Sequence, residues 1–237
     1  MQLAIQKSKT FIEFEVTRSK RKTMAITISP TGNVRVAAPN RISNKEIIDW
    51  VNSKSNWIVN KLDEINKLRA ANTSREYIQG ELFTYLGLDY PLHIETHNKR
   101  TKPTADLYCG RLMVATPDQD AEIIRGAIEA WYRCMAGEHI RSRIDLFRPL
   151  LNVSPQRVTI KNQKTRWGSC SSKGNLNFNW KAIMAPPKVV DYLVVHELCH
   201  LIHLNHSEDF WKLVSSTLPD YKAGKDWLRK NGSRLSL

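Results

Sequence analysis

The most constraining feature of this chain is the pattern of histidine and glutamate in residues 195–206. His196 and His200 are four residues apart, so on a helix both imidazoles project from one face and can reach a single metal ion. Glu197 is rotated by about 100° from His196, which places its carboxylate beside such an ion and not on it. A general base for a zinc-activated water belongs at that place. The pattern therefore predicts a zinc site with a catalytic glutamate.

A hydrolytic zinc site uses three protein ligands and keeps one position open, so a third ligand is needed. His203 lies on the same helical face as His196 but roughly 10 Å further along the axis. His206 follows a predicted turn at Leu204 and Asn205, where asparagine tolerates the left-handed conformation. This geometry favours His206 as the third ligand. His203 is then a core residue, a surface residue, or a residue that hydrogen-bonds to a metal ligand.

The four cysteines offer no alternative zinc site. Cys109, Cys134, Cys170 and Cys199 are scattered and include no C-x-x-C pair, so free thiols in a reducing compartment are expected. The first ten residues lack an apolar signal region, and no apolar run approaches the roughly 20 residues that cross a bilayer. These observations predict a cytoplasmic protein with no membrane segment.

The chain is strongly basic, with a formal net charge of +13. Residues 1–70 hold 13 Lys and Arg against 6 Asp and Glu, a net of +7, and the remainder holds 23 against 17, a net of +6. A local basic run occupies residues 18–22. This balance favours nucleic acid or another acidic partner for the N-terminal region, although a solvated basic surface explains it equally well.

The pattern of elements predicts an α+β fold with an N-terminal region, 1–76, and a catalytic domain, 77–237. Apolar alternation at Ile12, Phe14 and Val16 and again at residues 24–28 predicts a β-hairpin. Ser43 and Glu46 form a capping box at the start of a helix whose apolar stripe extends to Leu68. Residues 70–75 suit a linker.

The second region begins with strands between residues 81 and 115, followed by a long helix over 121–147. Strands are predicted at 157–160 and 175–178, helices after Pro187 and Ser207, and a last helix between Pro219 and Gly232. Residues 167–169 are predicted as the edge strand of a substrate cleft, with a buried turn as the alternative. The zinc-binding helix is expected to pack on a small antiparallel sheet.

Several short motifs together resemble the YgjP-like family of metallopeptidases. They are Arg166-Trp-Gly-Ser-Cys170, Asn179-Trp180, Ala185-Pro186, Asp191-Tyr192, His196-Glu-Leu-Cys-His200, Asn205-His-Ser207 and Phe210-Trp211. The resemblance implies a zincin fold in which His196, His200 and His206 bind zinc and Glu197 is catalytic. The family is similar to the WLM and SprT-like proteases, some of which act on proteins attached to DNA. By this resemblance the chain is a metalloendopeptidase-like hydrolase with protein or peptide substrates.

Zinc-dependent hydrolysis also needs a donor that stabilises the oxyanion of the transition state. Arg166 and Tyr192 are candidates for this transition-state or substrate contact. Tyr192 lies one helical turn before His196, on the same face. A structural role is the alternative for each.

A competing hypothesis for the whole chain is a basic nucleic-acid-binding module with a structural zinc, and recruitment of a peptidase to DNA-bound proteins would combine both ideas. Hydrolysis of an amide outside proteins is a third possibility.

Overall fold

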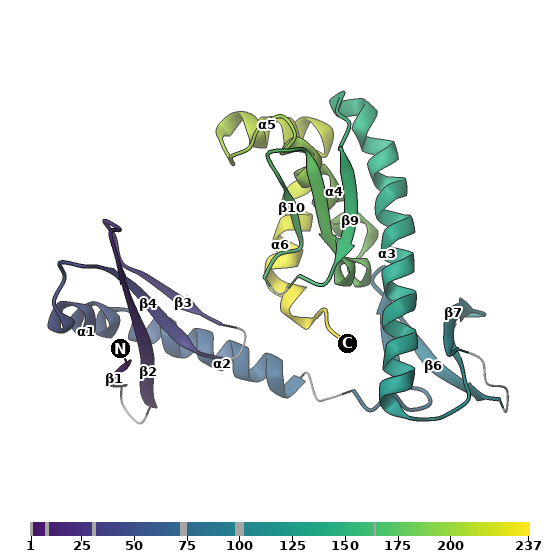
Figure 1. The fold of residues 1–237 in the computed structure, drawn as a ribbon, viewed down its shortest axis with the longest axis horizontal. Helices are drawn as coiled ribbons and strands as arrows, with labels where there is room; N and C mark the ends of the chain where they lie inside the picture. The colour runs from purple at the N-terminus through teal and green to yellow at the C-terminus, as the bar shows by residue number, and fades with distance from the viewer. Residues whose placement is uncertain (1, 8–9, 30–31, 72–74, 98–101, 164) are drawn as a thin grey trace. The chain divides into compact units, whose positions relative to one another are not determined.

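The computed structural model describes residues 2–7, 10–29, 32–71, 75–97, 102–163 and 165–237. The chain forms two compact units, Met1–Thr73 and Ser74–Leu237. Both combine helices with small mixed sheets, so the α+β class predicted from the sequence is confirmed (Figure 1). Among the described residues, no helix is long and apolar enough to cross a membrane.

The N-terminal unit contains a sheet of strand order β1-β2-β4-β3 with two helices. Its elements are β1 (Gln2–Lys7), β2 (Thr10–Ser19), β3 (Ala25–Ile28), β4 (Val34–Pro39), α1 (Asn44–Ser53) and α2 (Ser55–Ala71). The predicted hairpin of β2 with β3 is wrong, because β4 lies between them, parallel to β2 and antiparallel to β3. β1, which the sequence pattern did not reveal, pairs antiparallel with β2.

The predicted start of α1 is confirmed in atomic detail. The Ser43 hydroxyl accepts a hydrogen bond from the Glu46 backbone N–H at 3.2 Å, and the Glu46 carboxylate accepts one from the Ser43 N–H at 2.8 Å. The single helix expected from the apolar stripe is instead divided at Lys54 into α1 and α2. The side chain of Leu68 and residues 72–74 of the predicted linker lie outside what the structure describes.

Arg18, the first residue of the basic run, is used within the fold of the N-terminal unit. Its guanidinium donates to the backbone carbonyls of Pro39 and Asn40, at 3.4 and 3.3 Å, and to that of Ile42. A further hydrogen bond reaches Oδ1 of Asn44 at 2.7 Å. These bonds fix the loop that leads into α1, so the charge of Arg18 has a structural role.

The C-terminal unit contains two sheets. The first has the order β5-β6-β8-β7 and the second the order β10-β11-β9. Their strands are β5 (Leu82–Tyr85), β6 (Leu88–Thr96), β7 (Thr104–Tyr108), β8 (Arg111–Thr116), β9 (Arg157–Lys161), β10 (Gly168–Cys170) and β11 (Asn175–Asn179). The second sheet is not antiparallel as predicted, because β9 is parallel to β11. β10 and β11 form an antiparallel hairpin whose second strand lies in the middle of the sheet.

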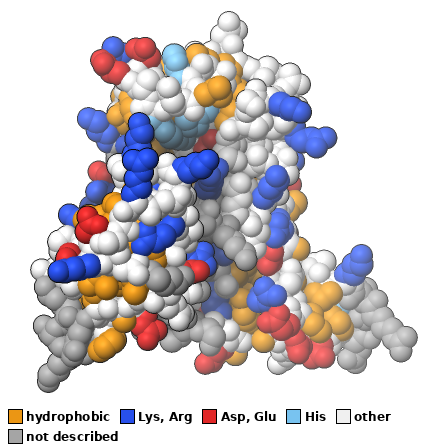
Figure 2. Space-filling model, turned by 60° about the vertical axis from the view of Figure 1, so that its left-hand side comes forward, with side chains coloured by type: hydrophobic (Ala, Val, Ile, Leu, Met, Phe, Trp, Pro, Cys, Tyr) orange, Lys and Arg blue, Asp and Glu red, His pale blue; other side chains and the backbone are white. Residues whose placement is uncertain are grey.

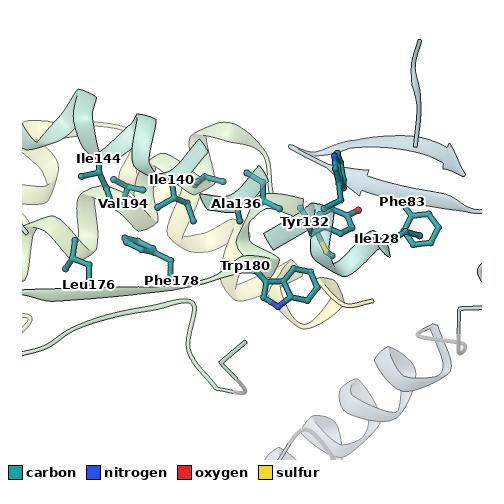
Figure 3. Close-up of a cluster of buried hydrophobic side chains, with 14 of the residues drawn as sticks. Phe83, Ile128, Tyr132, Ala136, Ile140, Ile144, Leu176, Phe178, Trp180 and Val194 are labelled. Atoms are coloured by element: carbon teal, nitrogen blue, oxygen red, sulfur yellow. The ribbon is translucent and has the colours of Figure 1, made fainter. Parts of the chain in front are cut away.

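The long helix α3 (Ala121–Leu151) supports the rest of the C-terminal unit. The other helices are α4 (Pro187–Cys199), α5 (Glu208–Thr217), α6 (Tyr221–Asn231) and the 3-10 helices η1 (Trp180–Met184) and η2 (Gly232–Arg234). Buried side chains four residues apart on α3 face β11, η1 and α4 in one core (Figure 3). They are Ile128, Tyr132, Ala136, Ile140 and Ile144, opposite Leu176, Phe178, Trp180 and Val194.

An ion pair also joins α3 to α4. Arg143 donates two hydrogen bonds to the Asp191 carboxylate, with 2.9 Å between Nη2 and Oδ2. The two side chains are only 28% and 14% exposed, so solvent screens the pair little. Asp191 lies five residues before His196, and the pair therefore helps to fix the part of α4 that carries the histidine.

Replacing Arg143 tests the importance of this ion pair. Arg143→Met should lower the free energy of unfolding by about 2 kcal/mol, because it leaves the Asp191 carboxylate poorly solvated and unpaired. Arg148→Met is a matched control on the same helix. It removes a more exposed pair with Asp145, at 3.2 Å, and should cost less than about 1 kcal/mol. Urea denaturation measures both values, and equal losses would contradict a special role for the Arg143 pair.

Candidate metal centre

Helix α4 carries two of the predicted site residues near its C-terminal end. Pro187 occupies its first turn, where the missing backbone N–H costs no hydrogen bond. The helix is apolar on most of its surface and is buried on several sides, with Val194 and Val195 fully inaccessible. His196 and Glu197 lie in its last turn, and His200 is its C-cap residue. Packing of α4 therefore fixes the backbone from which these side chains project.

The chain changes direction after α4 in two steps, and the second lies at Leu204 and Asn205, where the sequence predicts a turn. A turn occupies residues 200–202, where the His203 N–H donates to the Cys199 carbonyl at 3.0 Å, and a bend follows at 204–205. Asn205 does not have the left-handed conformation that was expected of it, since its φ is not positive. The turn at the helix end and the bend at Leu204 and Asn205 together bring His206 back towards α4, without a left-handed residue.

His196, His200 and His206 together form the candidate metal centre. One ring nitrogen of each lies within 4.8 Å of the others, and this is the only such group among the described residues. The Nε2 atoms of His196 and His206 are 3.0 Å apart. Two ligand nitrogens of a tetrahedral zinc ion are roughly 3.3 Å apart, given Zn–N distances of about 2.0–2.1 Å. Figure 2 shows histidine side chains reaching the molecular surface beside hydrophobic ones.

The orientation of the His200 ring is set by a backbone carbonyl. Its Nδ1 lies 2.9 Å from the carbonyl oxygen of His203, so Nδ1 carries the proton and donates it. Nε2 is then the unprotonated nitrogen that a metal ion requires. His203 supplies only this backbone oxygen, because its side chain is not part of the cluster.

Aromatic residues at the start of α5 pack against the histidine rings. The Phe210 ring is stacked on His200, with 4.6 Å between centroids, and the Trp211 ring is stacked on His206 at 5.6 Å. Ser207 caps α5 as predicted, since its hydroxyl accepts a hydrogen bond from the Phe210 N–H at 3.4 Å. These contacts limit the rotation of both imidazoles.

The surroundings of His196 and His206 favour the neutral form of both rings. Burial lowers the pKa of His196 to about 3, and the charges of His200, His206 and Lys225 act in the same direction. Burial likewise lowers the pKa of His206. Neutral imidazole is the form that binds metal, so these two rings do not have to lose protons before binding near neutral pH. In donor type and spacing, these residues fit a divalent ion such as zinc.

Glu197 directly follows His196 on α4, and its side chain is poorly solvated. Its side chain is buried, and burial raises its pKa to about 8 against the opposing charge of Arg166. Its Oε2 has no hydrogen-bond partner among the described residues. Gly168 of β10 lies against this carboxyl, because a Cβ added there would be 2.5 Å from Glu197 Oε1. Only glycine allows β10 to approach Glu197 this closely.

The structure also places the two predicted contact residues near the site. Arg166 is exposed in the loop before β10, and its charge acts on the Glu197 carboxyl. Tyr192 is buried, with its ring centroid 5.7 Å from that of His196. Burial raises the pKa of Tyr192 to about 12, so its hydroxyl keeps its proton. β10 is an edge strand, as predicted from residues 167–169.

One residue near the histidines had no signal in the sequence. Lys225 on α6 has its Nζ 3.9 Å from the centroid of the Trp211 ring. Its surroundings in the sequence are those of an ordinary exposed helix face, rich in lysine and arginine. Only the packing of α6 shows that this lysine belongs to the neighbourhood of the candidate metal centre.

Comparison with protein-family models identifies the chain. The model of the YgjP-like metallopeptidase domain matches residues 22–231. This chain belongs to the YgjP-like family. A metallopeptidase family implies a bound metal ion and a protein or peptide substrate, in agreement with the resemblance seen in the sequence motifs.

The other comparisons add little to this assignment. A search of curated proteins found no match. Among solved structures, the crystal structure of the metallopeptidase zymogen of Pyrococcus abyssi abylysin is similar at 21% sequence identity. The match covers 38% of this chain and 92% of that chain, with a TM-score of 0.36.

The burial of Glu197 has a measurable pH dependence in the metal-free protein. Its folded pKa, about 8, lies above the ordinary value of 4.5, so folding binds a proton between these pH values. The contribution of this group to stability is full below pH 4.5 and is lost as pH rises through 8. Glu197→Gln removes that loss. After chelation, the variant should melt a few degrees above wild type at high pH and close to it at pH 5. A difference independent of pH would contradict a buried titrating carboxyl.

Proposed function

We propose that the chain is a zinc-dependent peptidase with a zincin-like site, in which His196, His200 and His206 bind the ion and Glu197 is the general base. The observation that supports this most directly is the cluster of three ring nitrogens within 4.8 Å of one another, on a helix that also carries the buried carboxyl of Glu197. Three ligands leave a coordination position open for substrate. A structural zinc site normally closes with four protein ligands and needs no such carboxyl.

Zinc in this site supplies a Lewis acid that acidifies water and polarises the scissile carbonyl group. Glu197 would accept the proton of the attacking water and then deliver it to the leaving amine. The poorly solvated position of Glu197 makes it a stronger base than an exposed carboxylate, and a nearby cation lowers its pKa again towards the working pH. Its fixed position against Gly168 keeps the carboxyl close to the substrate.

The edge strand β10 is the proposed place for the peptide backbone. β10 pairs with β11 on one side only, so its other edge can take an extended peptide as an additional strand. Because Gly168 of this strand touches Glu197, such a peptide would pass the general base. Tyr192, which keeps its proton, and Arg166, beside Glu197, are the proposed contacts for the oxyanion or the substrate.

Nucleic-acid binding remains a prediction from net charge alone. The formal charge of +13 still favours an acidic partner. Arg18, however, donates to backbone carbonyls of its own unit, so fewer N–H donors of the basic run at residues 18–22 are available to a phosphate. We therefore place the peptidase function first and leave recruitment to DNA-bound proteins as an untested addition.

Glu197→Gln tests the proposed general base. The variant should hydrolyse an unfolded protein such as casein about a thousandfold more slowly than wild type, because glutamine cannot accept the proton. It should still carry zinc, since Glu197 is not a ligand. Glu138→Gln, an exposed change on α3, is the control and should keep the wild-type rate. Full activity of the Glu197 variant would exclude the base role, and loss of its zinc would instead indicate a role in metal binding.

A further inference from the structure

Helix α6 approaches α4 very closely one residue before Lys225. A Cβ added at Gly224 would lie 2.7 Å from the Cβ of Tyr192 and 3.5 Å from the carbonyl oxygen of Lys188. The first distance is shorter than carbon atoms tolerate, so glycine is needed for this crossing. The crossing brings Lys225 to the same side of α4 as the histidines.

An aromatic side chain lies between Lys225 and the candidate metal centre. Trp211 is stacked on His206 with 5.6 Å between ring centroids, and on Tyr221 at 5.5 Å. The Nζ of Lys225 lies 3.9 Å from the Trp211 centroid. This contact holds the ammonium group by roughly 0.5–1 kcal/mol and does not neutralise its charge. The Trp211 ring therefore holds the positively charged Lys225 close to His206, a predicted metal ligand.

The charge of Lys225 has no acidic partner among the residues that the structure describes. Its neighbour Asp226 is paired with Arg229 at 3.1 Å. Lys212, on α5, differs in this respect, because Glu208 binds it at 2.8 Å. After burial and the neighbouring histidines, the charge of Lys225 is a further cause of the lowered pKa values in the cluster. An anion that enters the site would therefore meet an unneutralised cation.

Two exposed cations act on different parts of the site. Arg166 acts on the Glu197 carboxyl, whereas Lys225 acts on His196 and His206. A bound divalent ion would make this surface more positive still. Such a site favours a substrate that carries negative charge near the scissile bond.

We propose that Lys225 binds a carboxylate of the peptide substrate, so that the site prefers acidic peptides to neutral ones. This inference rests on the proposed peptidase function. The carboxylate can belong to an acidic side chain or to the free carboxyl end of the peptide. A lysine ammonium suits either, because it is a compact charge with three rotatable donors.

Peptide binding to the zinc-loaded Glu197→Gln protein tests this without hydrolysis. The probes are a fluorescein-labelled neutral peptide with an amidated end, the same peptide with a free carboxyl end, and the amidated peptide with central glutamates. Fluorescence anisotropy gives the affinity of each probe. Lys225→Met, Lys225→Arg and the control Lys212→Met are added to the Glu197→Gln background. Lys225 is exposed, and a thermal melt of each variant verifies its fold.

At least one acidic probe should bind about fivefold more tightly than the neutral peptide, a preference that Lys225→Met abolishes. Lys225→Arg and Lys212→Met should retain it, because each leaves the positive charge at position 225. Loss with the carboxyl-end probe alone would identify a terminal carboxylate, and loss with the glutamate probe alone an acidic side chain. Lys225→Glu should favour a peptide with central lysines. Equal affinities in the parent protein, no measurable binding, or an acidic preference unchanged in Lys225→Met would overturn the inference.

Casein hydrolysis by the otherwise wild-type protein separates this inference from the proposed function. If wild-type protein with zinc digests casein while Lys225→Met leaves peptide preference unchanged, only the role of Lys225 is wrong. If zinc-loaded wild-type protein digests nothing, the peptidase proposal itself fails.

Discussion

The close packing of α4 against its neighbours is the constraint on which the site depends. Two glycines make this packing possible. Gly168 lets β10 lie against the Glu197 carboxyl, and Gly224 lets α6 cross α4 at Tyr192. On the remaining side, the core of α3 and the Arg143 ion pair hold the helix. The same contacts that stabilise α4 therefore orient the histidines, bury Glu197 and place Lys225 near the candidate metal centre.

This packing also explains the electrostatics of the site. Removing water from around His196 and Glu197 disfavours the charged form of each, so the histidine stays neutral and the carboxyl holds its proton more strongly. Poor solvation of a histidine and a carboxyl on one helix is costly for folding but suited to a divalent cation, whose charge would compensate for the lost solvation. Exposed Arg166 and Lys225 border the cluster on the solvent side.

Much of the candidate site could be predicted from the sequence, because the residue patterns that indicate it are local. On a helix, the four-residue spacing of His196 and His200 puts both rings on one face and Glu197 beside them. Caps such as Ser43 likewise depend only on neighbouring residues. Pairings between distant segments were not accessible in this way. The pairing of β4 with β2 and the parallel alignment of β9 with β11 are decided by tertiary packing. The alternation of apolar residues along one strand does not show which strand pairs with it or in which direction. Lys225 was missed for the same reason.

Metal content per chain tests the central claim most directly, when measured by elemental analysis on wild type, His206→Ala and His203→Ala. The account predicts close to one zinc per chain in wild type, loss in His206→Ala, and retention in His203→Ala, because only the backbone oxygen of His203 serves the site. Retention in His206→Ala together with loss in His203→Ala would contradict the proposed ligand set. A wild-type protein that takes up no zinc would contradict the metallopeptidase mechanism as a whole.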